Sequence, residues 1–391
     1  MRRRGAYELR DVYVKDRVFA SGNQALVRIM LERKRLDRKM NLNTGGFVSG
    51  YRGSPLGGVD MEMKRASSEL IEHEIHFEAG LNEDLAATSI WGTQLVSLAD
   101  EYGFKSTHDG VFSMWYGKGP GVDRSIDALK HANLVGTSRL GGVLAVFGDD
   151  HACKSSTLPH QSEQSMIAAS IPVLHPCGLS ELVEYGVLGF EMSRYSGCWI
   201  GLKTTSDNMD SSESIDSKLP NTFSTPTPIP EENVHARSGE FKLVEAERRL
   251  HNIKLPAVKR FWRDNGNDRV VFGISMEDPI RIGIVGVGKA CLDVMKALKR
   301  MGVRNEEEAK SRGISIFKVG MSYPLEPTKI GAWAKMCDKI MVVEEKRSLV
   351  EMQLKDLMYN NNNKNLIVGK HDEMGMSLLP QHGMLVFSML I

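Results

Sequence analysis

The 391-residue sequence predicts an α/β protein with a doubly wound parallel sheet and a second, smaller α/β unit. Three observations indicate this fold class. Short apolar runs alternate with helix-length stretches between residue 21 and about residue 205, a second alternating unit begins at Arg281, and glycine-rich polar motifs directly follow several apolar runs. Ligand-binding loops gather at the carboxyl ends of parallel strands, so these motifs predict a binding edge on the larger sheet.

The first unit begins with a helix over residues 23–40, where apolar residues recur at helical spacing among basic ones. A strand over residues 45–51 follows and ends in a glycine-rich loop. The stretches between the later strands are long enough for helices, which parallel strands need as crossover connections. Those strands are expected at residues 75–77, 111–115, 142–147, 171–174 and 198–203.

We divide the chain into an N-terminal extension (1–20), a first domain (21–206), a linker with a connecting helix (207–280), a second α/β domain (281–370) and a tail (371–391). The linker is rich in Ser, Pro, Asp and Thr, and Pro256 should end or kink its helix. In the second domain, strands are expected at 281–287, 314–319 and 339–344, and helices at 289–301, 328–337 and 347–358.

Composition excludes several classes of partner. The formal net charge is +1, so neither nucleic acid nor a membrane is expected as a partner. The five cysteines contain no Cys-x-x-Cys pair, which removes the local motifs for zinc and iron–sulfur ligation. Scattered cysteines without a signal peptide indicate reduced thiols and a cytoplasmic location. The apolar end, residues 384–391, is far shorter than the ~20 residues of a membrane helix.

Glu83 is the strongest catalytic candidate on helical spacing. Asn82 is a typical N-cap residue, and Ala86, Ala87 and Ile90 fall on the same helix face as Glu83. This apolar face predicts that the Glu83 carboxyl points into the interior, where burial favours the protonated acid and the helix N-terminus favours the carboxylate. A carboxyl balanced between these forms suits proton transfer. The alternative is an exposed first-turn acid that only complements the helix dipole.

Several motifs lie in a fixed order along the chain: GNQA (22–25), GYRGSPLGG (50–58), NEDLA (82–86), WYGKGPGVDR (115–124), GDDH (148–151) and SSTLPHQSE (155–163). In this order they resemble the pyrimidine-binding half of the indolepyruvate ferredoxin oxidoreductases. The likeness is greatest to the long, fused bacterial form of that enzyme. It runs from about residue 21 to about residue 380, which is nearly the whole chain.

The resemblance implies a thiamine-diphosphate-dependent 2-oxoacid oxidoreductase. Residues 21–206 would form the thiamine-diphosphate pyrimidine-binding domain, and residues 281–370 a transketolase C-terminal-like domain. By motif position, Glu83 matches the glutamate that hydrogen-bonds the aminopyrimidine ring of the cofactor. The accompanying candidates for cofactor binding are Gly53, Ser54, Pro55 and Asn82.

The resemblance also indicates what this chain does not supply. In the family, the diphosphate and magnesium motif belongs to another domain, so we expect the tail to be truncated and the chain to be incomplete alone. Magnesium and iron–sulfur clusters are expected only from parts of the enzyme outside this chain. The expected partners are that diphosphate-binding domain or subunit, ferredoxin and coenzyme A, with the chain itself in a homo-oligomer.

Arg52, Lys118 and Arg124 are the candidate substrate-binding residues, because a cation in a loop at the ligand edge can bind the carboxylate of a 2-oxoacid. Arg52 stands where related two-subunit members commonly carry proline, which leaves its role open. Each residue could equally be a surface cation beside a turn. Three aromatic residues could line an indole pocket or belong to the core: Trp91, Trp115 and Tyr116.

The loop after the fourth strand offers a metal alternative. Asp149, Asp150, His151 and His160 form a plausible ligand set, but loop acids and histidines are mostly solvated. The magnesium motif of thiamine enzymes also needs an asparagine pair, and none follows at the expected interval. We therefore expect no metal in this chain, and we assign the loop to closing the cofactor or subunit boundary.

A glycine-rich turn at residues 283–290 resembles two nucleotide-binding motifs, the P-loop and the dinucleotide fingerprint, but lacks a required residue of each. Ala290 stands where a P-loop needs Ser or Thr, and Lys318 lies where the dinucleotide fingerprint needs an acid. We expect Gly286 and Gly288 to serve close helix packing instead. An NAD-dependent dehydrogenase is therefore the disfavoured third alternative.

The sequence thus predicts the N-terminal part of an indolepyruvate (aryl 2-oxoacid):ferredoxin oxidoreductase. The implied reaction is oxidative decarboxylation of a 2-oxoacid to its acyl-coenzyme A with reduction of ferredoxin. The alternative is a catalytically incomplete fragment or a non-catalytic assembly subunit of the same fold.

Overall fold

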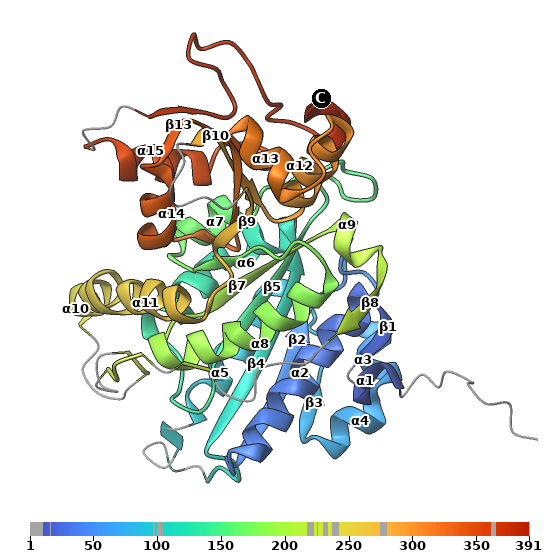
Figure 1. Cartoon of the computed structure of the whole chain (residues 1–391). Coiled ribbons are helices and arrows are strands. Elements are labelled where there is room, and N and C mark those ends of the chain that lie inside the picture. Colours follow the sequence, from blue (N-terminus) through green and yellow to red (C-terminus); the bar gives the residue numbers. More distant parts are fainter. Residues whose placement is uncertain are drawn as a thin grey trace, which may run out of the picture.

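A seven-stranded sheet forms the centre of the larger domain in this computed structural model, with strand order β12-β6-β7-β5-β4-β2-β3 (Figure 1). All neighbouring strands are parallel except the pair β12 and β6. Its strands are β2 (Thr44–Gly50), β3 (Ile75–Phe77), β4 (Gly110–Lys118), β5 (Val143–Asp149), β6 (Val173–Leu174), β7 (Ile200–Thr205) and β12 (Met321–Tyr323). The structure describes residues 11–15, 17–96, 98, 99, 103, 105–216, 223, 224, 226–229, 234–236, 242–273, 280–360 and 365–390.

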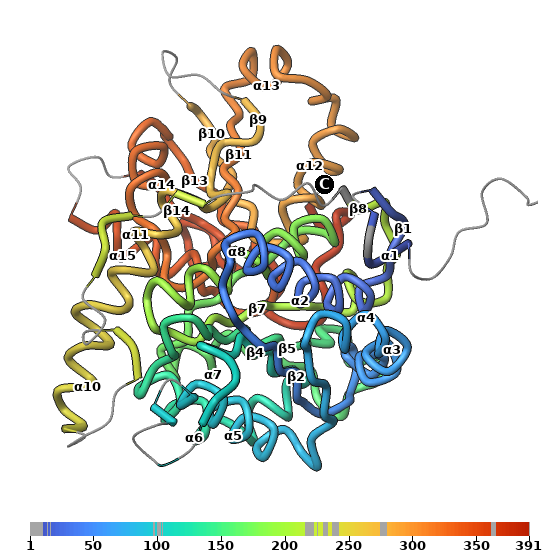
Figure 2. The backbone as a smooth tube through the Cα atoms, turned by 90° about the horizontal axis from the view of Figure 1, so that it is seen from below, coloured from blue at the N-terminus to red at the C-terminus, as the bar shows by residue number. Residues whose placement is uncertain are grey.

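Helices cover both faces of this sheet, as a doubly wound fold requires (Figure 2). One face carries α2 (Gly22–Lys39) and α8 (Leu179–Ser196), and the other carries α5 (Glu83–Thr93), α6 (Gly119–Val135) and α7 (Glu163–Ala168). The short helices α3 (Val59–Arg65) and α4 (Ser67–Glu72) connect β2 to β3. Ser21 caps α2 through a capping box with Gln24, which fixes the start of the first predicted helix.

A two-stranded antiparallel ribbon lies beside the larger sheet and was not predicted from the sequence. It pairs β1 (Arg17–Ser21) with β8 (Ser212–Asp216), and the short helices α1 (Asp11–Val14) and α9 (Ser206–Met209) precede the two strands. Part of the predicted N-terminal extension and part of the predicted linker therefore pair with each other.

The connecting helix accommodates its proline by changing helix type. It consists of α10 (Leu243–Arg249), a π-helical turn (Leu250–Lys254) and α11 (Leu255–Asn265), with Pro256 in the first turn of α11. A proline there has no N–H to donate, and the wider turn before it absorbs the missing bond. The helix therefore changes its winding without ending.

The smaller domain is built on a five-stranded sheet of order β14-β13-β10-β11-β9. Its strands are β9 (Arg269–Phe272), β10 (Ile280–Val287), β11 (Ile314–Val319), β13 (Cys337–Val343) and β14 (Leu366–Val368). One face carries α12 (Lys289–Arg300), α13 (Glu306–Arg312) and a final 3-10 turn (Phe387–Leu390), and the other carries α14 (Pro327–Ala334) and α15 (Val350–Met358). This sheet begins upstream of residue 281, because β9 adds an antiparallel edge.

β12 follows β11 of the smaller domain in the chain, but it pairs with β6 at the edge of the larger sheet. A strand between elements of the smaller domain therefore belongs to the sheet of the larger one.

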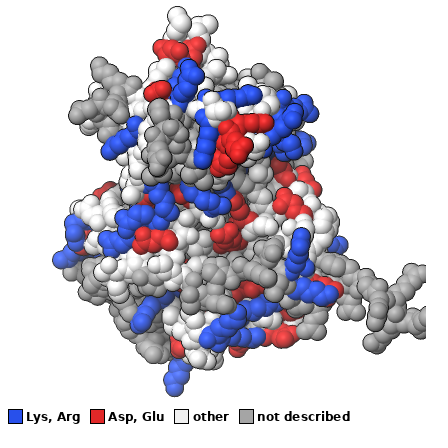
Figure 3. Space-filling view, in the orientation of Figure 1, with Lys and Arg blue, Asp and Glu red and all other residues white. Residues whose placement is uncertain are grey.

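The face shown in Figure 3 carries interspersed basic and acidic side chains, in line with the formal net charge of +1. Within the described residues, no helix combines the length and the apolar character that crossing a lipid bilayer demands.

Candidate active site

The carboxyl ends of β2, β4 and β5 bring three of the predicted motifs together. The side chain of Lys118, at the end of β4, packs over Gly53, where a Cβ would lie 2.5 Å from Lys118 Cδ. Ser155 Oγ donates to Ser54 Oγ at 2.6 Å, which joins the segment after β5 to the loop after β2. Pro55 packs against the end of β5. The expected binding edge therefore forms from motifs that lie far apart in the sequence.

Glu83 begins α5 at this edge, where the chain returns from β3. Gly80 N donates to Gly50 O at 2.9 Å, so the segment leading to α5 stays beside the end of β2. Asn82 caps α5, and its side chain accepts a hydrogen bond from Leu85 N at 2.8 Å. Glu83 is only 5% exposed. The residues predicted to share the helix face of Glu83 are buried as well: Ala86, Ala87 and Ile90.

The surroundings of the Glu83 carboxyl are small and apolar. A Cβ on Gly121 would lie 2.6 Å from Glu83 Oε1, and a Cβ on Gly117 would lie 3.3 Å from Glu83 Cγ. Trp115 Nε1 donates to the backbone oxygen of Glu83 at 2.9 Å, which fixes the peptide rather than the carboxyl. Among the residues that the structure describes, none donates a hydrogen bond to this carboxyl or forms an ion pair with it. Glu83 is therefore a nearly buried acid whose carboxyl has no partner among the described residues.

The three predicted substrate cations lie in different environments. Lys118 is half-buried over Gly53, whereas Arg52 and Arg124 are exposed. Arg124 lies on α6, and Arg52 lies in the loop after β2. Only Lys118 is thus held in place by packing at the edge.

The predicted aromatic residues do not line a common pocket. Trp115 and Tyr116 are fully buried and belong to core clusters on opposite faces of β4. Tyr116 OH donates to Asp60 at 2.5 Å, and Trp91 stacks on His131 with 6.2 Å between ring centroids. The core interpretation of these residues is correct.

The acids and histidines of the loop after β5 point to separate partners. Asp149 accepts hydrogen bonds from Ser162, and His160 faces Asp123 at 3.0 Å. Burial opposes ionisation of Asp150, but the backbone amides of residues 154–156 outweigh it and lower the pKa of that carboxyl. Across the described part of the chain, no group of three His, Cys, Asp or Glu side chains could hold a metal ion.

His151 lies at the boundary between the domains instead. Its Nδ1 is 3.6 Å from the Glu345 carboxylate, and its backbone oxygen accepts a hydrogen bond from Lys346 Nζ at 2.6 Å. Burial, followed by the nearby ammonium group of Lys203, lowers the pKa of His151 well below its ordinary value. This segment therefore packs at the boundary between the two domains of this chain, and its role at a cofactor or subunit boundary stays a prediction.

A buried ion cluster next to this boundary was missed in the sequence. Lys203, at the end of β7, is fully buried 2.5 Å from Glu163 Oε1 and 3.6 Å from Asp149 Oδ2. Burial opposes the charge of Lys203, but Glu163 and Asp149 outweigh it and raise the pKa of the ammonium group. A charged residue at the end of an otherwise apolar strand is the signal that could have revealed it.

The glycine-rich turn of the smaller domain packs in the way that the sequence predicts. Gly288 has φ +52°, and a Cβ there would lie 2.3 Å from the His175 ring. A Cβ on Gly286 would lie 2.7 Å from Cys291 Cα. Lys289 pairs with Asp293 at 3.1 Å. These glycines allow close contact between strand, helix and the larger domain.

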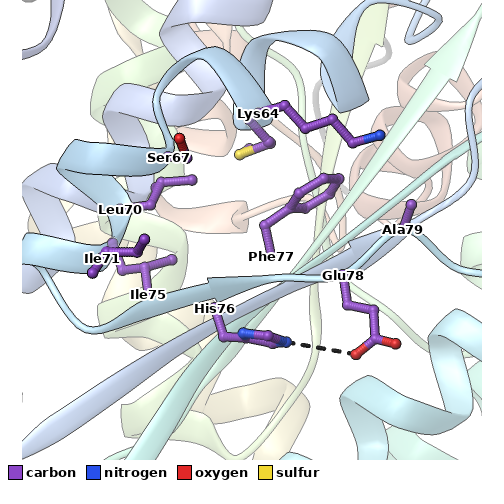
Figure 4. Close-up of a pocket in the computed structure, with 10 residues that line it drawn as sticks. Lys64, Ser67, Leu70, Ile71, Ile75, His76, Phe77, Glu78 and Ala79 are labelled. Carbon is purple, nitrogen blue, oxygen red and sulfur yellow. Dashed lines mark ion pairs between the residues drawn. The ribbon is translucent and has the colours of Figure 1, made fainter.

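A pocket of about 470 Å³ lies at the edge of the larger sheet, away from these loops (Figure 4). Its walls come from α3, α4 and β3 and their connections, with Leu70, Ile75 and Phe77 among the apolar residues. His76 and Glu78 form an ion pair at 3.5 Å on one side. The pocket therefore does not include the Glu83 carboxyl.

Comparison with known proteins identifies relatives over most of the chain. Residues 273–390 match the family model described as an indolepyruvate oxidoreductase domain. The chain is 23% identical over 349 residues to the indolepyruvate oxidoreductase subunit IorA of Pyrococcus abyssi, covering 87% of this chain and 47% of that protein. For the IorA subunit of Methanothermobacter marburgensis the identity is 23% over 372 residues, with 92% and 51% covered. The chain spans about half the length of the curated relatives it matches.

Two solved structures share the fold. A 2-oxoglutarate:ferredoxin oxidoreductase from Magnetococcus marinus, with 2-oxoglutarate, coenzyme A and succinyl-CoA bound, has a TM-score of 0.64 at 15% identity and covers 96% of this chain and 64% of its own. A split-gene transketolase, an inactive β4 tetramer, has a TM-score of 0.52 at 9% identity and covers 90% and 89%. These likenesses confirm the predicted fold class, a parallel doubly wound α/β domain with a second, smaller α/β domain. The resemblance inferred from the motifs is confirmed at this level: the chain is similar to IorA subunits of indolepyruvate oxidoreductases over most of its length, and its smaller domain matches the indolepyruvate oxidoreductase model.

Proposed function

We propose that this chain forms the aminopyrimidine-binding half of an indolepyruvate-type 2-oxoacid:ferredoxin oxidoreductase. One observation carries the proposal. Glu83 presents a nearly buried carboxyl at the ligand edge of the sheet, and no described side chain pairs with it. A buried carboxyl without a partner is costly, so a bound group that hydrogen-bonds it would offset that cost.

The residues around Glu83 fit a flat heterocycle better than a metal or a phosphate. Gly117 and Gly121 let the Glu83 side chain pack directly against their backbones, because a Cβ on either would press on it. The Trp115 indole holds the backbone of Glu83, and Asn82 holds the start of α5. These contacts orient the carboxyl without consuming its hydrogen-bonding capacity.

Thiamine diphosphate, when bound, supplies the nucleophilic carbon that attacks a 2-oxoacid. Glu83 would hold a proton at a ring nitrogen of the aminopyrimidine, which requires a hydrogen bond from the carboxyl to that atom. Gly53, Ser54 and Pro55 would border the cofactor, and Lys118 would face the substrate carboxylate. Arg52 and Arg124 are proposed only as secondary cations that attract the substrate.

The diphosphate and its magnesium ion would be held by another domain or subunit. Leu81 is 85% exposed and Leu85 is 48% exposed, and both flank Glu83 in the sequence. Exposed apolar residues beside a binding edge are typical of a surface that a partner covers. The names of the relatives support ferredoxin and coenzyme A as further partners and an aryl 2-oxoacid as substrate.

The test is exchange of the thiazolium C2 proton of thiamine diphosphate, measured on the assembled enzyme with magnesium present. Glu83→Gln keeps the shape of the side chain and removes its ionisable proton, so exchange should slow by orders of magnitude while the fold stays intact. Asp84→Asn changes the neighbouring first-turn acid and should leave exchange near the wild-type rate. An exchange rate of Glu83→Gln close to that of wild type would refute the assignment.

The alternative is a non-catalytic assembly subunit of the same fold. It predicts that adding the diphosphate-binding partner creates neither cofactor binding nor reduction of a dye by indolepyruvate and coenzyme A. Our proposal predicts that both appear with the partner and that this chain alone, with magnesium and thiamine diphosphate, stays inactive. Turnover by the 391-residue chain alone would contradict the division of the site.

A further inference from the structure

Two cysteines from different domains meet at the domain boundary. Cys177 lies in the larger domain between β6 and α8, and Cys291 lies in the first turn of α12 in the smaller domain. Cys177 Sγ donates to Gly288 O at 2.9 Å, and Cys291 N donates to the same oxygen at 3.0 Å. The two thiols also lie close enough for each to shift the pKa of the other. A single carbonyl thus holds both residues in place.

The other three cysteines occupy separate positions. Cys198 and Cys337 are buried in different core clusters, and Cys153 donates to Ser156 O in the segment after β5. All five cysteines are free thiols. The chain therefore offers one cysteine pair and three single cysteines that serve as internal controls.

The surroundings of the pair favour thiolate chemistry. The neighbouring Cys177 thiol lowers the pKa of the Cys291 thiol, and burial opposes this shift. Cys291 also lies at the N-terminus of a twelve-residue helix, where the helix dipole stabilises a thiolate. The ammonium group of Lys318, which is paired with Glu181, lies near Cys177. The pKa is lowered for Cys291 and raised for Cys177, so Cys291 is the nucleophile of the pair.

We propose that Cys177 and Cys291 form a reversible dithiol–disulfide site that a peroxide oxidises and that joins the two domains covalently. The Cys291 thiolate attacks one peroxide oxygen; a sulfur–oxygen bond forms, the oxygen–oxygen bond breaks and hydroxide leaves. Cys177 then attacks the sulfenic sulfur; the disulfide forms and hydroxide leaves to become water with the released protons. In total, two thiols and one hydrogen peroxide give one disulfide and two waters.

The boundary is already arranged for this bond. His175 N donates to Gly320 O at 2.7 Å two residues before Cys177, and β12 pairs with β6 next to it. Gly288 packs against the His175 ring three residues before Cys291. The two segments are therefore held together by contacts that do not involve sulfur. Oxidation would fix the smaller domain over the carboxyl edge of the larger sheet.

The experiment oxidises the native full-length chain with a small molar excess of hydrogen peroxide at neutral pH. Free thiols are then alkylated in acid and the peptides are mapped without reduction. We expect a linked peptide pair containing Cys177 and Cys291, loss of two of the five titratable thiols, and recovery of both with dithiothreitol. Urea unfolding of the oxidised protein should shift to a higher midpoint, because the cross-link constrains the unfolded chain.

Matched variants separate this pair from general thiol oxidation. Cys153→Ser removes a partly exposed single cysteine and should leave the linked peptide unchanged, whereas Cys291→Ser should abolish it. Oxidation of the urea-unfolded wild-type chain is a control that needs no variant, and it should lose the preference for this pair. The proposal is overturned if native protein loses thiols without the linked peptide, if Cys153 is consumed first, or if peroxide leaves all five thiols intact.

Discussion

Replacing Lys203 by methionine should destabilise the folded protein by about 3–5 kcal/mol at neutral pH. The ammonium group is fully buried and lies 2.5 Å from Glu163 Oε1 and 3.6 Å from Asp149 Oδ2. At an effective dielectric constant of ~20, these distances correspond to attractions of about 7 and about 5 kcal/mol, which offset the desolvation of three ions. Methionine has a similar volume but leaves two buried carboxylates without their cation.

Urea unfolding of both proteins across a pH series measures this difference. Burial raises the pKa of Glu163 above its ordinary value, and loss of Lys203 should raise it further. A raised carboxyl pKa gives stability that is fully present below the unfolded value of 4.5 and is lost as pH rises through the folded value. The deficit of Lys203→Met relative to wild type should therefore grow as pH rises above 4.5.

Two further variants test whether the unpaired carboxylate causes this loss of stability. Lys203→Met combined with Glu163→Gln should recover roughly half of the lost free energy, because a neutral amide replaces the stranded carboxylate. Lys130→Met changes an exposed lysine of α6 and should stay within about 0.5 kcal/mol of wild type. A loss of less than ~1 kcal/mol for Lys203→Met at neutral pH, or a deficit that shrinks as pH rises, would show that Lys203 does not stabilise the buried carboxylates.

Three other predictions concern the boundary and the candidate site. Burial lowers the pKa of His151 and His175 well below 6.5, so stability should fall as pH drops below 6.5, by about 1.4 kcal/mol per histidine near pH 5.5. Urea midpoints measure this loss; His175→Gln should reduce it, and the exposed control His76→Gln should not. Gly288→Ala should lower the free energy of unfolding by about 2 kcal/mol or more, measured by thermal unfolding, because the positive φ and the His175 ring leave no room for a Cβ. NAD or ATP should not raise the unfolding temperature of the wild-type protein. Asn82→Ala should cost about 1 kcal/mol through loss of the α5 cap, and an unchanged unfolding curve would show that the cap is dispensable.

Apolar periodicity predicted most of the fold, because burial on a sheet face or a helix stripe is a local property of the sequence. The strands at residues 75–77 and 314–319 coincide with β3 and β11. The burial of Glu83 followed from the small apolar residues at helical spacing after it. These predictions needed no knowledge of distant residues.

The features that sequence reasoning missed depend on contacts between distant residues. β8 pairs with β1 across the chain, and its alternation of Ser, Glu and Asp with one buried Ile215 is typical of a surface loop. Lys203 pairs with Glu163, which lies forty residues earlier in the sequence. Cys177 lies near Cys291, which belongs to the other domain. Such pairs are set by topology, which spacing along one element does not encode.

The carboxyl edge of the larger sheet divides into two halves with different neighbours. Parallel strands gather helix N-termini and polar loops at this one edge, so acids buried there need a cation, an amide or a ligand. At β5 and β7, Lys203 pairs with the buried acid Asp149. Lys346 of the smaller domain donates a hydrogen bond to the backbone oxygen of His151. At β2 and β4, the described residues offer Glu83 no such partner. The segment after β5 touches both halves, since Ser155 contacts the loop after β2. The buried acids of one half are therefore paired with a cation within the larger domain, whereas at the other half no described residue pairs with the Glu83 carboxyl, where we propose that the aminopyrimidine binds.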